Sequence, residues 1–180
     1  TPTPKQAEIM AAWVKSIENK VFERETSHDG EFIQRILIEV LGYTGSGAGG
    51  DYTVAKNIPL KPKGNVDVAL GRFTKGIQDE VLVPFELKGA KTKDLDAVMT
   101  GRHKSPVEQA WEYAAKVRGA QWVLVSNYVE IRLYAVSYGQ QYYETFDLAK
   151  LNDPDEFARL YLLLSAASLL GNRTQALLKE

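Results

Sequence analysis

Two apolar stretches of this chain each contain an acidic residue at a position where a buried strand is expected. They are residues 65–70, NVDVAL, and residues 81–88, VLVPFELK. An ionised carboxylate in an apolar strand is costly unless another group compensates its charge, and a bound cation is the simplest compensation. The chain must therefore fold so that Asp67 and Glu86 share a compensating group.

The spacing of these residues indicates how they meet. Asp67 and Glu86 are 19 positions apart, which suits two adjacent strands joined by a loop. Lys88 follows Glu86 by two positions, so strand alternation places both side chains on one face of a sheet. Two carboxylates and a lysine on one face form a hard-metal site with a positive group beside it, which is suited to hydrolysing a phosphodiester.

The set Asp67…Glu86-Leu87-Lys88 resembles the D…ExK core of the PD-(D/E)XK nuclease superfamily, with Val66 in place of the usual proline. Residues 105–114, SPVEQAWEYA, resemble the Q-x-x-x-Y helix that follows this core in several branches. Further on, residues 122–128 and 131–134 resemble the next two strands of the N-terminal nuclease domain in bifunctional type IIG restriction–modification enzymes.

The resemblance extends from about residue 25 to residue 170 and implies a restriction-endonuclease-like core. It implies that residues 1–180 are a single nuclease domain, the N-terminal fragment of a longer protein. That protein would continue into a helical connector, an adenine methyltransferase that uses S-adenosylmethionine, and a target-recognition domain. Two other interpretations remain: the nuclease module of a type I-like restriction motor or a repair nuclease, and a catalytically silent DNA-binding scaffold on the same fold.

For the site, the resemblance implies one or two Mg²⁺ ions, with Mn²⁺ as a substitute, held by Asp67, Glu86 and the backbone carbonyl of Leu87. Lys88 would orient the attacking water, and Gln109 would contact the metal site or the DNA backbone. The products would carry 5′-phosphate and 3′-hydroxyl ends. The alternative is that Glu86 and Lys88 form an exposed pair at a strand end, and that Asp67 is ion-paired nearby.

Family members often supply a third carboxylate from a helix before the sheet. Glu39 lies seven residues after Phe32, so an α-helix would place the two on roughly the same inward face. Glu39 is therefore expected as a further metal ligand, with Glu31 and Glu25 as weaker candidates. His28 and His103 are expected at the surface.

The charge distribution bears on the partner. A net charge of −1 argues against a protein that grips DNA with its whole surface. The segment from Lys88 to Lys104, however, contains five Lys or Arg and two Asp, and it comes directly after the expected metal ligands. We expect DNA contacts from this segment and the helix after it: Lys91, Lys93, Arg102, His103, Lys104 and Tyr113. A cutting module of this kind binds double-stranded DNA weakly, and cutting both strands implies a transient dimer or sequential nicking.

The order of expected elements predicts an α/β (α+β) fold with a mixed central sheet flanked by helices. Ser105, Pro106 and Glu108 form a capping box that starts one helix. The metal site is expected near the sheet edge. Helices are expected at residues 5–22, 31–41, 105–118 and 154–170; strands are expected at 54–60, 65–70, 81–88, 121–126, 130–136 and 143–146, with a turn at 61–64.

Composition removes several classes of function. The chain has no cysteine, which excludes disulfides, thiolate metal sites and a cysteine nucleophile. With two histidines, a zinc site is not expected. No stretch is long and apolar enough to span a membrane, so we expect no membrane partner. The absence of cysteine fits a reducing cytoplasm, which is the expected location.

Overall fold

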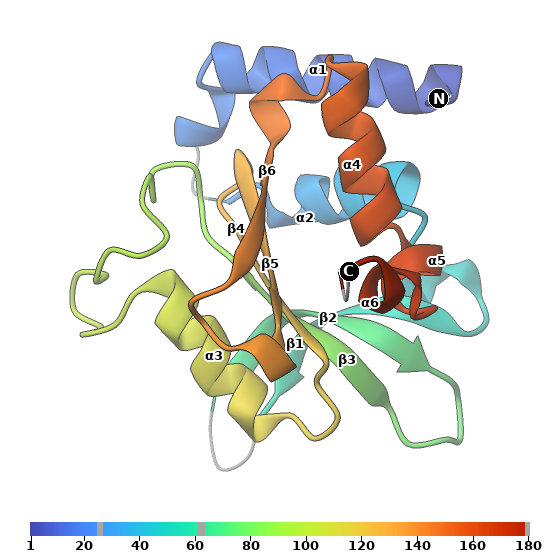
Figure 1. The fold of residues 1–180 in the computed structure, drawn as a ribbon, viewed down its shortest axis with the longest axis vertical. Coiled ribbons are helices and arrows are strands. Elements are labelled where there is room, and N and C mark those ends of the chain that lie inside the picture. Colours follow the sequence, from blue (N-terminus) through green and yellow to red (C-terminus); the bar gives the residue numbers. More distant parts are fainter. Residues whose placement is uncertain (25–26, 61–63, 179–180) are drawn as a thin grey trace.

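A six-stranded sheet forms the centre of the molecule (Figure 1). The computed structural model describes residues 1–24, 27–60, 64–178 of the chain. The strands are ordered along the sheet as they are along the chain, and β3 and β4 are parallel whereas all other neighbours are antiparallel. The predicted mixed sheet is therefore confirmed. Its strands are β1 (Tyr52–Pro59), β2 (Asn65–Phe73), β3 (Glu80–Leu87), β4 (Trp122–Ser126), β5 (Glu130–Ala135) and β6 (Tyr143–Asp147).

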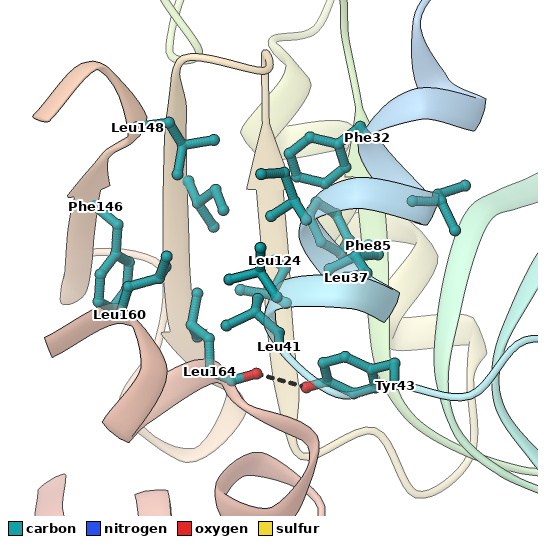
Figure 2. Close-up of a cluster of buried hydrophobic side chains, with 14 of the residues drawn as sticks. Phe32, Leu37, Leu41, Tyr43, Phe85, Leu124, Phe146, Leu148, Leu160 and Leu164 are labelled. Carbon is teal, nitrogen blue, oxygen red and sulfur yellow. Dashed lines mark hydrogen bonds between the residues drawn. The ribbon is translucent and has the colours of Figure 1, made fainter. Parts of the chain in front are cut away.

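One face of the sheet carries the larger core. Figure 2 shows Phe85 and Leu124 from the sheet packed with Phe32, Leu37 and Leu164 from the helices. The helices that supply this layer are α1 (Pro4–Glu18), α2 (Asp29–Phe32), the π-helix η2 (Ile33–Val40), α4 (Pro154–Leu164) and α5 (Ala166–Leu169). Across this core the hydroxyl of Tyr43 donates to the carbonyl of Leu164 at 2.8 Å.

The other face is covered by α3 (Pro106–Lys116), which connects the parallel strands β3 and β4 (Figure 1). A parallel pair needs such a crossover, and the crossover helix must lie on one face of the sheet. Strand alternation in β4 then sends Leu124 to the larger core and Val123 and Val125 to a smaller core beneath α3. The capping box predicted for this helix is present: Ser105 Oγ accepts from the backbone N–H of Glu108 at 3.0 Å.

Several predicted helix limits were wrong. The first helix ends at Glu18, because Lys20 adopts a left-handed φ of 55° before a short 3₁₀ turn, η1 (Val21–Glu23). The last predicted helix breaks at Ser165, whose extended backbone ends α4 and whose side chain caps α5. A further helix, α6 (Arg173–Leu178), follows. In the predicted turn at 61–64, residues 61–63 lie outside the described part of the chain.

The outer side of β6, the last strand of the sheet, is partly covered by side chains of α4. Arg159 Nη1 donates to the carbonyl of Thr145 at 2.7 Å, and the N–H of Asp147 donates to Glu156 Oε1 at 3.1 Å. Both backbone groups are of the kind that an incoming strand would pair with. The edge of the sheet is thus capped by an arginine and a glutamate.

A bulge in β2 makes one glycine sensitive to substitution. The pairing with β3 shifts between Leu70 and Gly71, and a Cβ built on Gly71 would lie 1.9 Å from the carbonyl oxygen of Glu80. We predict that Gly71→Ala lowers the free energy of unfolding by about 2–3 kcal/mol, as expected for overpacking. Urea unfolding measures this. Gly47→Ala is the control, because nothing lies within 4 Å of its added carbon; equal effects of the two substitutions would contradict the prediction.

Candidate metal and phosphodiester site

Asp67 and Glu86 meet at the point where β2 begins and β3 ends. Val68 of β2 lies opposite Phe85 of β3, so the next position along the ladder sets Asp67 opposite Glu86. Val68 and Phe85 face the larger core, and alternation therefore turns both acids toward the side covered by α3. The sequence predicted this convergence. The strands involved are inner strands, second and third of six, and the site lies where these two strands begin and end.

Lys88 and the backbone of Leu87 bind the two acids directly. Lys88 Nζ lies 2.7 Å from Glu86 Oε1, and the N–H of Leu87 donates to Asp67 Oδ2 at 3.0 Å. The Glu86 side chain is 2% exposed and that of Lys88 is 16% exposed. The alternative of an exposed pair at a strand end is therefore excluded. Leu87 itself points its side chain into the larger core.

Burial and mutual repulsion set the electrostatics of the pair. Burial raises the pKa of Glu86 to about 7, with the charge of Asp67 adding to the rise and Lys88 opposing it. Burial also raises the pKa of Asp67; the Leu87 N–H and Lys88 lower it, and the charge of Asp29 raises it again. One lysine thus compensates the two carboxylates only in part. A cation placed between them would favour the ionised form of both.

Two buried oxygens near the crossover helix have no hydrogen-bond donor. They are Glu86 Oε2 and Gln109 Oε1, which belong to β3 and to the helix α3 packed against it. Gln109 is 4% exposed, and its Nε2 donates to the hydroxyl of Tyr113 at 2.7 Å, which leaves the amide oxygen without a donor. Buried polar atoms normally find partners, so an unpartnered oxygen within the carboxylate pair fits a hard cation such as Mg²⁺.

The protein ligands available to such an ion are few. Within the described residues, no three acidic, histidine or cysteine side chains gather closely enough to enclose a metal ion. Mg²⁺ is commonly bound through one or two carboxylates, with water and substrate phosphate in its other positions. The Asp67–Glu86 pair fits this mode of binding.

Glu39 does not join the pair, contrary to prediction. Its carboxylate accepts from Arg35 Nη1 at 3.0 Å, and the segment that carries it is a π-helix. A π-helix holds more than four residues per turn, so seven residues after Phe32 amount to roughly one and a half turns. Glu39 is therefore turned away from the inward face that an α-helix would have given it. Glu31 contacts His28, and Glu25 lies outside the described residues.

The acid that the sequence missed is Asp29. It is the first residue of α2, and its charge acts on Asp67. The sequence does show an acidic residue at the start of a helix, but such a residue also fits an ordinary helix cap and so does not by itself indicate a site residue. His28, expected at the surface, is instead buried against Phe22 and Tyr128, with ring centroids 5.0 and 6.1 Å away.

The basic segment carries less available charge than its composition indicates. Lys93 is paired with Glu23 and Lys104 with Glu112, at 2.8 and 2.7 Å. Lys91, Arg102 and His103 are exposed, as expected for residues that contact DNA. Tyr113, the remaining predicted DNA contact, is half-buried in its hydrogen bond with Gln109.

None of the protein-family models, curated proteins or solved structures compared with this chain matches it. Among the described residues, none of the helices has the length and apolar character needed to cross a membrane.

The raised pKa of Glu86 makes a prediction about stability. The pKa rises from an ordinary 4.5 to about 7, so between these values the folded protein holds more protons than the unfolded chain. The stability of the metal-free protein should therefore fall as pH rises through this window, by up to about 3 kcal/mol. Glu86→Gln removes the titrating group, and we predict that it stabilises the metal-free protein at pH 8 relative to wild type but not below pH 4.5.

Urea unfolding in a chelator at several pH values measures this difference. The control is Glu80→Gln, whose side chain is 52% exposed at the other end of the same strand. Its effect should not depend on pH across the window. A Glu86→Gln protein that is destabilised equally at pH 4.5 and pH 8 would contradict the prediction.

Proposed function

We propose that this domain is a Mg²⁺-dependent endonuclease that hydrolyses phosphodiester bonds in DNA. The observation that carries the proposal is Glu86, a buried carboxylate with one oxygen on Lys88 and the other without a donor, set opposite Asp67. A purely structural ion pair would need no second acid facing it. The geometry supports a site that gains charge compensation when a divalent cation enters.

The roles of the side chains follow from their contacts. The metal supplies Lewis acidity toward the phosphate and lowers the pKa of water. Asp67 and Glu86 would bind the ion, and the N–H of Leu87 holds Asp67 in place. The carbonyl of Leu87, the residue after Glu86, would be a further ligand. Lys88 would place the attacking water and offset phosphate charge. Gln109, fixed by Tyr113, would direct its amide oxygen to the ion or its waters. Asp29 would accept hydrogen bonds from the hydration shell.

Weak and non-specific DNA binding is part of the proposal. The net charge is −1, and two of the basic-segment lysines are already paired with glutamates. Affinity for DNA grows with the number of phosphates neutralised, so the exposed Lys91 and Arg102 alone support a low affinity with a shallow salt dependence. Sequence recognition then belongs to other domains of the same chain.

The finer assignment rests on the sequence resemblance. By that resemblance, the domain would be the N-terminal part of a type IIG restriction–modification enzyme, with an S-adenosylmethionine-dependent methyltransferase and a target-recognition domain downstream. Double-strand cleavage would then need a transient pair of these domains or two successive nicks. The same site would serve a restriction motor or a repair nuclease, and the sequence of the intact gene would decide among them.

Nicking of supercoiled plasmid tests the proposal. We predict that Lys88→Ala lowers the rate at least about 100-fold, the size of effect seen when a charge-stabilising group is lost. Mg²⁺ and Mn²⁺ should support cleavage, whereas Ca²⁺ should bind without supporting it. The control is Lys75→Ala, which is exposed in the loop between β2 and β3, at the opposite ends of these strands from Asp67 and Glu86. Wild-type rates from Lys88→Ala, or rapid cleavage with all metal chelated, would favour the silent scaffold or another function.

A second pair of variants separates the two candidate third acids. We predict that Asp29→Asn lowers the Mg²⁺-dependent rate about tenfold, as expected for an outer-shell partner, because its charge acts on Asp67. Glu39→Gln, which loses only its contact with Arg35, should stay within about twofold of wild type. A larger loss of rate in Glu39→Gln than in Asp29→Asn would instead support Glu39 as the third acid.

A further inference from the structure

The turn between β4 and β5 contains a tyrosine in a strained backbone conformation. Tyr128 has a φ of 74° and a side chain that is 1% exposed. A bulky residue in the left-handed region persists only where its surroundings hold it there. The N–H of Tyr128 donates to Ser126 Oγ at 3.1 Å, and its carbonyl accepts from Trp13 Nε1 at 2.9 Å. Asn127 Oδ1 closes the turn by accepting from the N–H of Glu130 at 2.8 Å.

This conformation brings the tyrosine hydroxyl to the start of α2. The hydroxyl donates to Asp29 Oδ1 and accepts from the N–H of His28 at 3.0 Å. The ring lies between Phe22 and Phe32, with centroids 5.7 and 5.9 Å away. Both hydrogen-bonding functions of the hydroxyl are therefore used on two consecutive residues, and the packed ring cannot easily move away from them.

The same turn also contacts the strand that carries the site. The N–H of Lys88 donates to the carbonyl of Ser126 at 2.8 Å, which extends the pairing of β3 and β4. On the helix side, Phe32 lies one turn after Asp29 and packs on Phe85, with ring centroids 5.8 Å apart. The turn is thus tied at one end to the lysine of the site and, through Tyr128, to Asp29.

We infer that Tyr128 is a positioning residue, which fixes the orientation of the Asp29 carboxylate so that it can accept from the waters of a divalent cation bound to Asp67 and Glu86. This inference rests on the proposed function. By occupying Oδ1, the hydroxyl leaves Oδ2 of Asp29 as the oxygen available to a further donor such as water. Without the hydroxyl, the carboxylate is free to rotate away from a neighbour of like charge.

A matched control exists elsewhere in the larger core. Tyr43 is also buried, and its hydroxyl donates to the carbonyl of Leu164 at 2.8 Å (Figure 2). Tyr128→Phe and Tyr43→Phe each remove one buried hydroxyl, which makes two hydrogen bonds in Tyr128 and one in Tyr43, so both should lower the melting temperature. Only Tyr128→Phe releases a carboxylate next to the proposed site.

Mn²⁺ is titrated into the protein without DNA, and the electron paramagnetic resonance signal of the free ion reports how much of it stays unbound. A general loss of stability does not change this readout. We expect Tyr128→Phe to weaken Mn²⁺ binding about tenfold, as for other outer-shell partners, and Tyr43→Phe to leave the affinity unchanged. Asp29→Asn, which keeps the tyrosine, should weaken binding similarly. The double variant should lose no more than either single variant, because both act through one carboxylate.

Wild-type Mn²⁺ affinity in Tyr128→Phe, or additive losses in the double variant, would overturn the positioning role while leaving the nuclease proposal intact. A wild-type protein that neither binds Mn²⁺ nor nicks plasmid would overturn the nuclease proposal and the inference together. A Tyr43→Phe protein that loses Mn²⁺ affinity as strongly as Tyr128→Phe would show a general effect of core loosening, which also overturns the positioning role.

Discussion

The approach of two carboxylates inside a mostly apolar layer constrains much of this structure. Asp67 and Glu86 face each other across the β2–β3 pair, and burial disfavours the charge of both. The fold offsets this cost with a lysine on one acid and a backbone N–H on the other. Both compensating groups come from the two residues after Glu86, so the end of β3 supplies an acid and the groups that hold the pair.

The parallel pairing of β3 with β4 gives this arrangement its surroundings. Because the chain must cross over between parallel strands, α3 lies on the face to which Glu86 points and brings Gln109 to the same side. The far end of β4 continues into the turn that holds Lys88 through Ser126. The one parallel junction in the sheet is thus also where its polar groups are concentrated, with extended apolar packing on the opposite face.

The elements that could be predicted from sequence are those whose signal is local. The alternation in β2 and β3 placed Asp67 and Glu86 together, and the Ser105–Glu108 capping box fixed the start of α3. Glu39 was misplaced because the sequence pattern predicts an α-helix, whereas η2 is a π-helix with a wider turn. Asp29 was missed for a related reason, since its proximity to Asp67 arises from tertiary packing and not from the spacing of residues along the chain.

Charge was a second property that local counting misjudged. The segment from Lys88 to Lys104 has three more positive than acidic residues, yet Lys93 is paired with Glu23, 70 positions earlier in the chain. Its acidic residue Asp96 is in turn paired with Arg132 of β5 at 2.8 Å. Ion pairs between distant parts of the chain therefore change the electrostatic potential at the surface that a polyanion would contact. A count of charges along the sequence cannot include these pairs.

The capped edge of β6 limits how two copies of the domain could associate. Continuous sheets form between molecules when an outer strand offers a regular row of unpaired N–H and C=O groups. Here Arg159 and Glu156 take up the carbonyl of Thr145 and the N–H of Asp147. A pairing strand would have to displace both side chains before its own ladder could form. The sheet is thereby protected from growth by strand addition at this side.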